Sequence, residues 1–264
     1  MDYRIINCKS IINNITKKDV LFHGSYCIDP YQNCEFGCCY CDSSIEKTIY
    51  VKINAIQILK KELESVKDGR IIIGSVHDPY QNIEKKFNLT KSILELLIQH
   101  NLPCHILTKS PLILRDVDLL SQLDCIITMS VSSFNDQVIR IFEPEVPSPR
   151  VRLQTVRALH NHGITTGVAL MPMLPYIVEP EIESIVNAAY TAGAQYILHK
   201  YLELKGDQER LFKKLIEAHY PQLLPKYDAL YGNDFKPHKQ YIESLNLALA
   251  DCCKKFNIPT KITL

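Results

Sequence analysis

The stretch DPYQNCEFGCCYCDSS, residues 29–44, holds four of the ten cysteines of the chain: Cys34, Cys38, Cys39 and Cys41. Cys34, Cys38 and Cys41 have the spacing C-x3-C-x2-C. Three thiolates on one tight loop can bind three irons of a [4Fe–4S] cube. The fourth iron then has no protein ligand and can chelate a small molecule through an amine and a carboxylate. Cys39, beside Cys38, is expected to point away from such a cluster.

A structural zinc ion is the main alternative for this loop. Zinc sites with cysteine pairs usually have a second Cys or His pair at finger spacing, and the sequence offers only the lone His23 nearby. An inert group of buried thiols is disfavoured by the polar flanking residues Asn33, Glu35 and Asp42. The spacing therefore favours an iron–sulfur cluster, and a metal-binding module without catalytic activity remains an alternative.

Composition and charge restrict the class of protein. The chain has 264 residues, 46% of them hydrophobic and 22% charged, which suits one large domain with a full core. Its formal net charge is +1 and no long run of one sign occurs, so a face for duplex nucleic acid is not expected. We see no leader-like segment and no run of roughly 20 apolar residues, which predicts a cytoplasmic location. Thiols stay reduced there, so clustered cysteines indicate metal binding or catalysis.

Six short, apolar runs rich in β-branched residues alternate with helical patterns. The expected strands are residues 20–28, 71–76, 104–108, 125–131, 164–171 and 196–199. Helices with a period of 3.6 are expected between them, one of them with Asn88 as its N-cap. This order predicts an α/β fold in which parallel strands are joined by right-handed crossovers. Six units are too few for a closed eight-stranded barrel, so a partial (β/α)6 barrel is expected, with a doubly wound sheet as the alternative.

Three segments are expected along the chain. Residues 1–19 form an N-terminal lead-in, 20–204 the partial barrel, and 205–264 a helical C-terminal extension that caps the barrel mouth. The extension holds a link rich in Pro and Tyr at 219–237 and a last helix at about 238–256. Ligands of both candidate folds bind at the carboxyl ends of the strands, where the cysteine loop follows the first strand.

Tyr40, directly before the last cysteine of the motif, completes a pattern that resembles the signature of the radical S-adenosylmethionine (SAM) enzymes. The segments DPYQNCEFGCCYC, GSVHDPYQNIEKKFNLT, ILTKSPLILRDVDLL, SVSSFNDQVIRIFEPEVPSPRVRL and MPMLPYI follow one another as in the spore photoproduct lyase-like branch. The resemblance implies a [4Fe–4S] cluster on Cys34, Cys38 and Cys41, and SAM as second cofactor. It also implies a one-electron donor such as flavodoxin or ferredoxin.

The same resemblance implies where SAM lies. Gly74, Ser75 and Val76 match the segment that receives the SAM amino group, and Lys109 is expected to meet the carboxylate. Arg152 is expected either to reach SAM or to pair with Glu143. The complete set of expected cofactor-binding residues is Tyr40, Gly74, Ser75, Val76, Lys109, Ser130, Ser132, Arg152, Ala169, Met171 and Leu198, the last three as an apolar wall for adenine. Ordinary surface or turn roles are the alternatives for Lys109 and the serines.

Substrate-binding candidates are His77, Asp78 and three tyrosines, Tyr26, Tyr80 and Tyr201, which can stack on a planar ring. The alternatives are a turn role for Asp78 before Pro79 and core positions for the tyrosines. Spore photoproduct lyase has a further cysteine as hydrogen donor, for which this sequence offers no equivalent. A small molecule is therefore expected, and nucleic acid is not. The length and layout are similar to those of queuine lyase, so a lyase acting on a modified nucleobase such as queuine, with release of a 7-deazaguanine base, is the leading expectation. A radical SAM enzyme of nucleic-acid repair or modification is the alternative.

Overall fold

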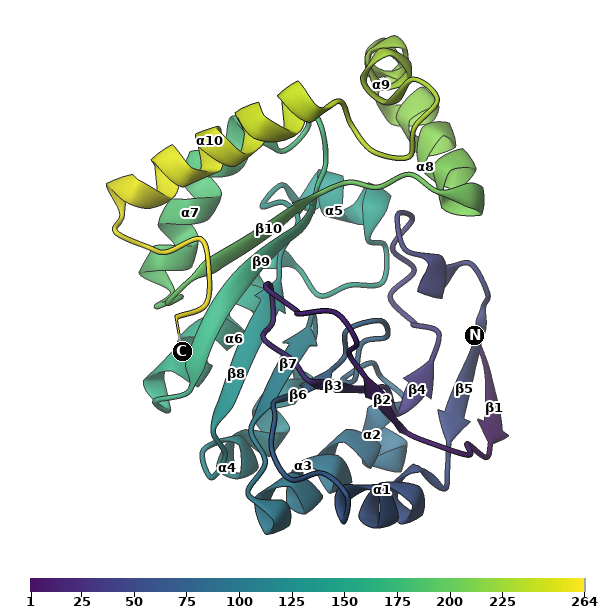
Figure 1. Ribbon diagram of the computed structural model, residues 1–264. Helices are drawn as coiled ribbons and strands as arrows, with labels where there is room; N and C mark the ends of the chain where they lie inside the picture. Colours follow the sequence, from purple (N-terminus) through teal and green to yellow (C-terminus); the bar gives the residue numbers. More distant parts are fainter. Residues whose placement is uncertain (264) are drawn as a thin grey trace.

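The computed structural model describes residues 1–263, and its centre is a curved seven-stranded sheet with the order β10-β9-β8-β7-β6-β3-β2 (Figure 1). The strands are β2 (Ile12–Asn14), β3 (Tyr26–Ile28), β6 (Ile71–Ile73), β7 (Cys104–Thr108), β8 (Cys125–Ser130), β9 (Thr165–Met173) and β10 (Ile197–Tyr201). All neighbours pair in parallel except β2, which is antiparallel to β3. The expected α/β fold with six parallel strands is confirmed.

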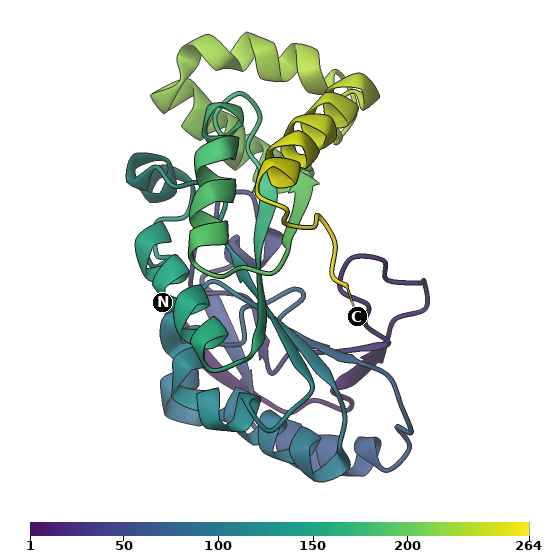
Figure 2. The same ribbon diagram turned by 90° about the vertical axis from the view of Figure 1, so that its left-hand side faces the viewer.

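Helices cover one face of this sheet, as Figure 2 shows. They are α1 (Ala55–Leu63), α2 (Glu84–Phe87), α3 (Leu89–His100), α4 (Val117–Leu120), α5 (Asp136–Phe142), α6 (Pro149–Asn161) and α7 (Ile182–Thr191). The helical pattern expected after Asn88 is observed as α3, and its apolar positions Ile93 and Leu97 are buried, at 0% exposure. Every residue of β6 and β8 is buried too, as expected for parallel strands covered on both faces. Asn88 stands at the predicted N-cap, but its side chain accepts from Arg115 Nη1 at 2.9 Å and caps nothing.

The N-terminal part differs from the prediction in two ways. Strand β3 covers only the end of the expected strand 20–28, because the Asp19 carboxylate accepts hydrogen bonds from the N–H groups of Leu21, Phe22 and Gly24. Such local bonds compete with strand pairing. The lead-in also forms two strands, β2 of the large sheet and β1 (Asp2–Ile6) of a second sheet. The second sheet has the order β1-β5-β4 and also contains β5 (Thr48–Lys52) and β4 (Tyr31–Gln32).

Three further helices lie over the carboxyl ends of the strands: α8 (Gly206–His219), α9 (Leu224–Tyr231) and α10 (Lys239–Lys255). Helix α9 falls inside the segment expected to be a link. Phe212 of α8 stacks on Phe142 at 5.3 Å between ring centroids, and the Tyr227 hydroxyl donates to the Pro175 carbonyl at 2.7 Å. These contacts attach the helices to the barrel mouth. The division of the chain at residues 19/20 and 204/205 stays a prediction.

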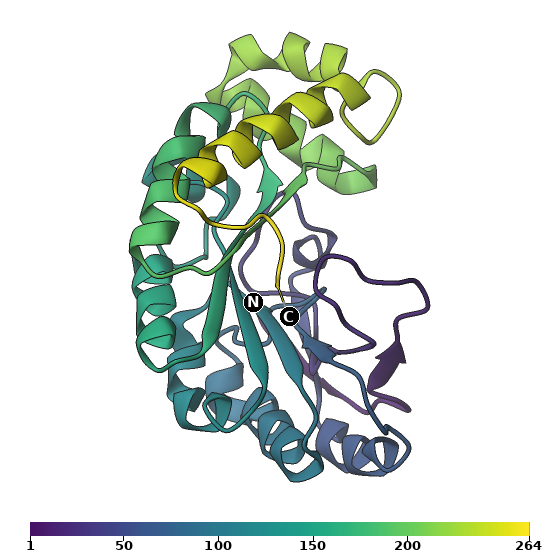
Figure 3. The ribbon, with the colours of Figure 1, turned by 60° about the vertical axis from the view of Figure 1, so that its left-hand side comes forward.

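After α10 the chain returns to the barrel along the open side of the sheet (Figure 3). The Ile197 N–H donates to the Pro259 carbonyl at 2.9 Å. Ile262, 4% exposed, joins an apolar cluster with Ile126 and Leu198, against which Leu21 and Phe22 also pack. Both ends of the chain therefore contribute to the inner apolar surface of the partial barrel.

A chain of polar groups lies beside this cluster. His105 Nδ1 faces the Phe22 carbonyl at 3.1 Å, and His105 Nε2 lies 2.6 Å from the Thr128 hydroxyl. The Tyr196 hydroxyl lies 2.7 Å from that of Thr128 and donates to the Ile127 carbonyl. Nδ1 faces a carbonyl and donates to it, and burial lowers the pKa of His105 to about 4, so the ring is neutral at neutral pH and Nε2 is free to accept from Thr128. Within residues 1–263, no helix has the length and apolar character that crossing a membrane requires.

Candidate active site

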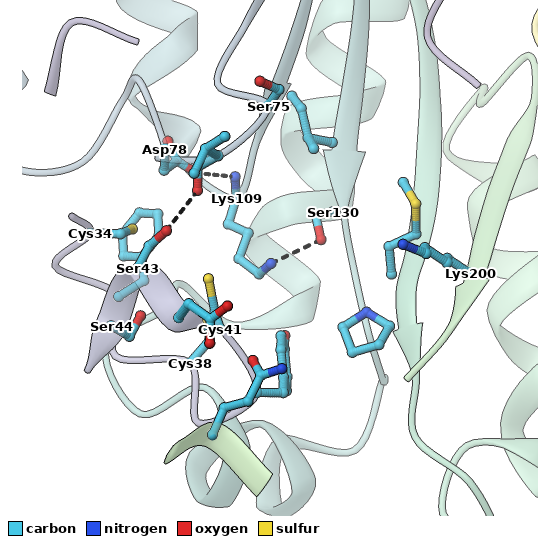
Figure 4. A pocket seen from close by; sticks show the side chains of 18 of the residues that line it. Cys34, Cys38, Cys41, Ser43, Ser44, Ser75, Asp78, Lys109, Ser130 and Lys200 are labelled. Atoms are coloured by element: carbon cyan, nitrogen blue, oxygen red, sulfur yellow. Dashed lines mark hydrogen bonds between the residues drawn. The ribbon is translucent and has the colours of Figure 1, made fainter. Parts of the chain in front are cut away.

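A cavity of about 480 Å³ lies at the carboxyl ends of the parallel strands (Figure 4). The cysteine loop forms one wall, the residues after β6 and at the ends of β7 and β8 form the back, and the segment from β10 into α8 forms the opposite wall. This is the position at which open and closed α/β sheets bind ligands. The cavity is therefore the candidate active site.

Backbone and side-chain bonds fix the cysteine loop. The Cys34 N–H donates to the Ser43 carbonyl at 2.9 Å, and the Cys41 N–H donates to the Cys38 carbonyl at 3.0 Å. The Ser43 hydroxyl donates to the Val76 carbonyl at 3.1 Å, which ties the loop to the segment after β6. Gly37 has a φ of +63°, a conformation that favours glycine. These bonds hold the cysteine loop against the segment that follows β6.

The thiols of Cys34, Cys38 and Cys41 line the cavity, whereas the buried Cys39 does not. Within the part of the chain that the structure describes, no three His, Cys, Asp or Glu side chains are placed to hold a single metal ion. Three soft thiols around a space, with no histidine on its wall, suit a larger iron–sulfur cluster with one open iron. Burial raises the pKa of Cys34 to about 12 and that of Cys38 well above its usual value, so a bound cluster would replace thiol protons.

Lys109 extends from the end of β7 toward the cysteine loop (Figure 4). Its ammonium donates to the Ser130 hydroxyl at 3.0 Å and lies 3.9 Å from Glu143 Oε1. Burial disfavours the charged form, but the Cys38 sulfur and the Glu143 carboxylate outweigh it and raise the pKa of Lys109. An ammonium has three N–H donors, so hydrogen-bonding capacity remains for an anionic ligand in the cavity.

Behind this wall lies a buried network around Glu143. Its carboxylate accepts from the hydroxyls of Tyr40 and of Ser132, the latter at 2.6 Å. Glu143 Oε2 lies 2.9 Å from Arg152 Nη2, an ion pair whose atoms are not aligned for a hydrogen bond. Burial disfavours the Glu143 carboxylate, but Arg152 and Lys109 outweigh it and lower its pKa. Ser132 and Arg152, expected to contact SAM, thus lie behind the cavity wall, and the alternative expected for Arg152, pairing with Glu143, is the one observed.

Asp78 lines the cavity, but its carboxylate is already occupied. Oδ1 accepts from the Tyr80 N–H at 2.9 Å and from the Thr108 hydroxyl at 2.8 Å, while Oδ2 accepts from the Lys109 N–H at 2.7 Å. The turn role is therefore the observed one. Asp78 joins the end of β7 to the segment after β6 and so places the Lys109 backbone.

Some of the other predicted residues line the cavity, and the rest lie away from it. Gly74, Ser75, Val76, Tyr40, Ser130, Met171 and Tyr201 line the cavity. Ala169 and Leu198 lie in the inner apolar cluster, below the cavity wall. Tyr26 stands at the amino end of β3, Tyr80 is a core residue with 0% exposure, and the His77 N–H donates to Asp29. Tyr26, His77 and Tyr80 do not line the cavity, because the strand starts later than expected and the chain turns at Asp78.

Of the wall made by β10 and α8, sequence reasoning found only Tyr201. Lys200, Glu203, Lys205 and Gln208 all line the cavity. Glu203 pairs with Lys200 at 3.2 Å and with Lys205 at 2.6 Å. The position of Lys200 at the end of the sixth expected strand was an available signal. The expectation that residues 205–264 cap the barrel mouth anticipated where α8 lies, but it named no residue of that helix as part of the site.

Comparisons with known proteins agree with this geometry. A family model described as the radical SAM superfamily matches residues 28–189. An uncharacterised protein of Methanocaldococcus jannaschii is 30% identical over 205 residues, which are 75% of this chain and 77% of the relative. An uncharacterised protein of Mycobacterium bovis is 25% identical over 272 residues, covering 95% of this chain and 80% of the relative.

Solved structures share the fold. A mutant of spore photoproduct lyase aligns with a TM-score of 0.72 and 16% identity, covering 99% of this chain and 82% of that one. A radical S-adenosylmethionine methyltransferase from Kitasatospora setae aligns with a TM-score of 0.51 and 13% identity, over 67% of this chain and 36% of that one. At these identities the likeness concerns the arrangement of strands and helices.

Proposed function

The chain belongs to the radical SAM superfamily, and on that premise we propose that Cys34, Cys38 and Cys41 hold a [4Fe–4S] cluster with SAM in the adjoining cavity. Enzymes of this superfamily use both cofactors. When bound, they supply a 5′-deoxyadenosyl radical that removes a hydrogen atom from a substrate. The observation that carries the proposal is the convergence of three thiols, the Lys109 ammonium and the Ser130 hydroxyl on one cavity.

The side chains around the cavity have separate roles in this proposal. Lys109 binds the SAM carboxylate through the N–H donors that Ser130 leaves free. The backbone at Gly74 and Ser75 offers polar groups to the SAM amino group, and Met171 offers apolar surface to adenine. Gln208 of α8 is buried at the opposite wall, so the helical cap limits access of water to the reaction.

For the substrate we propose a modified nucleobase, with a lyase reaction of the queuine lyase type that releases a 7-deazaguanine base. The Tyr201 ring, the Gln208 amide and the Glu203 carboxylate on the wall opposite the cysteines suit a flat base with amino groups. Reduction of the cluster is assigned to a one-electron donor such as flavodoxin or ferredoxin.

Modification or repair of nucleic acid is the second candidate. It is favoured by the fold shared with spore photoproduct lyase, one structure of which carries a dinucleoside spore photoproduct. The near-neutral charge of the chain favours the small molecule. Binding of a labelled oligonucleotide that weakens steeply with salt would favour the second candidate instead.

The test is anaerobic reconstitution with iron and sulfide, followed by SAM and a chemical reductant. We expect release of 5′-deoxyadenosine, and in the presence of queuine we expect a 7-deazaguanine base that has been freed from the cyclopentenediol of queuine. A cluster-loaded protein that leaves SAM intact contradicts the enzymatic proposal and favours a metal-binding module. SAM cleavage with intact queuine contradicts the substrate alone, and oligonucleotides are then the next compounds to assay.

A further inference from the structure

Glu143 connects four parts of the candidate site from a fully buried position. It follows α5, and its N–H donates to the Ile139 carbonyl at 2.7 Å, while the residue is only 1% exposed. The groups around its carboxylate come from the cysteine loop (Tyr40), the end of β7 (Lys109), the segment after β8 (Ser132) and α6 (Arg152). No other carboxylate of residues 1–263 forms an ion pair with Lys109 or Arg152.

Arg152 fixes the position of this carboxylate. The arginine is 0% exposed, and its Nε donates to the Pro147 carbonyl at 2.8 Å and its Nη1 to the Ser130 carbonyl at 2.9 Å. These two bonds orient the guanidinium from the protein side, so its remaining edge presents a fixed positive charge to Glu143. A guanidinium held in this way can rotate little.

The Glu143 carboxylate attracts the Lys109 ammonium but does not take up its hydrogen-bond donors. The separation of 3.9 Å between Nζ and Oε1 is too long for a hydrogen bond but short enough for strong attraction in a buried setting. The ammonium points between Ser130 and the cysteine loop, on the cavity side of the wall, while Glu143 stays behind it. Glu143 therefore fixes where the positive charge lies and leaves its donors to the cavity.

We propose that Glu143 is a positioning residue that places the Lys109 ammonium and the Tyr40 side of the cysteine loop relative to each other, so that the anionic end of SAM is bound beside the cluster. The inference rests on the proposed function. The alternative is that Glu143 only forms a structural ion pair with Arg152. That pair would stabilise the fold equally whether or not Lys109 were present.

The variant Glu143→Asp keeps the charge but withdraws the carboxylate by one methylene group. A shorter side chain cannot reach the loop, the strand ends and α6 together. SAM dissociation constants are measured by equilibrium dialysis of cluster-loaded protein, for Glu143→Asp, Lys109→Met and the double variant. We expect SAM affinity to fall about tenfold in Glu143→Asp. In the Lys109→Met background the same change should add little, since residues that act through each other are not additive.

Glu84→Asp is the matched control. Glu84 is also fully buried, accepts from a tyrosine hydroxyl, that of Tyr31, and pairs with an arginine, Arg115, at 2.8 Å, but it does not line the cavity. Glu84→Asp should lower the unfolding midpoint of the metal-free protein and leave the SAM dissociation constant unchanged. Iron content after reconstitution is measured in every variant, and we expect Glu143→Asp to keep it.

Three outcomes would overturn the proposal. Unchanged SAM affinity in Glu143→Asp does so, and so does an equal loss in the wild-type and Lys109→Met backgrounds. If wild-type protein carries a cluster but binds no SAM, the proposed function fails and this inference fails with it. If the wild type binds SAM and Glu143→Asp binds it equally well, only this inference fails. If Glu143→Asp does not fold, Tyr40→Phe removes one partner of the carboxylate. SAM affinity that is unchanged in Tyr40→Phe then counts against the proposal.

Discussion

The carboxylate of Asp78 accepts a hydrogen bond from the backbone N–H of Lys109 at 2.7 Å, and this bond joins two neighbouring strand ends at the candidate active site. Two further donors, the Tyr80 N–H and the Thr108 hydroxyl, share the same carboxylate. The residue that places the lysine therefore accepts three hydrogen bonds from the protein itself.

Replacing Asp78 tests this role. Asp78→Ala leaves three donors without their acceptor and should lower the free energy of unfolding by about 2–4 kcal/mol. Asp124→Ala, in which a 72% exposed carboxylate loses its pair with Arg70, should cost less than about 1 kcal/mol. Urea unfolding of the metal-free proteins measures both. Equal, small losses would contradict the role of Asp78 in holding the two strand ends together.

The neighbouring cysteines Cys38 and Cys39 should behave differently. Cys38→Ala removes a thiol from the cavity wall and should abolish most of the iron bound after reconstitution. Cys39→Ala changes a buried thiol outside the cavity and should keep the iron content of the wild type. Iron and sulfide analysis decides between them. Loss of iron in both variants, or in neither, would show that the ligands are not Cys34, Cys38 and Cys41.

The buried His105 predicts how stability changes with pH. Burial lowers the pKa of His105 to about 4 in the folded protein, whereas an unfolded histidine titrates near 6.5. As the pH falls from 6.5, the unfolded state binds a proton first, so this residue destabilises the fold progressively down to pH 4. The hydrogen bond to the Phe22 carbonyl opposes this shift of the pKa, and the charges of Arg70 and Asp19 have smaller effects than burial.

The expected loss over this range is up to about 3 kcal/mol. It is measured by denaturant unfolding at several pH values between 4 and 7. His105→Gln should remove the corresponding part of the pH dependence, because glutamine does not titrate. A variant with the same slope as the wild type would assign the pH dependence to other groups.

Gly74 predicts a steric requirement at the cavity. Its φ is +87°, and a Cβ there would lie 2.4 Å from Pro79 Cδ and 2.5 Å from the Leu107 carbonyl oxygen. Gly163 also has a positive φ, +75°, but a Cβ there meets nothing within 4 Å. Gly163→Ala should therefore cost only the conformational strain of about 1–2 kcal/mol. Gly74→Ala should cost clearly more, and equal unfolding midpoints would contradict the expected clash.

The sequence was sufficient for the parallel strands and for the cysteine side of the site. Buried parallel strands are nearly continuous apolar runs, and those at 104–108 and 125–131 were predicted within a residue of β7 and β8. The loop motif identified three thiols of the cavity wall, and the family resemblance added Lys109 and Ser130. The match of the family model to residues 28–189 confirms the family, and with it the [4Fe–4S] cluster and SAM as the cofactors.

Other features were not predictable from local pattern. Strand β1 has four exposed residues out of five, so its place in the second sheet depends on pairing with β5 and not on an apolar face. The wall contributed by Lys205 and Gln208 depends on how α8 packs on Phe142, a contact between distant parts of the chain. Ser132 was expected at the cavity but lies behind its wall, bonded to Glu143, whereas for Arg152 the expected alternative of pairing with Glu143 is the one observed.

The inner cluster that joins Ile262 to Leu21 and Phe22 has a consequence for the order of folding. Contacts between residues this far apart in the chain carry a high loop-closure entropy and tend to form late. A partly folded chain in which the segment at Ile262 has not yet docked therefore exposes the apolar interior of its half-open barrel, and a chaperone has access to it at that stage.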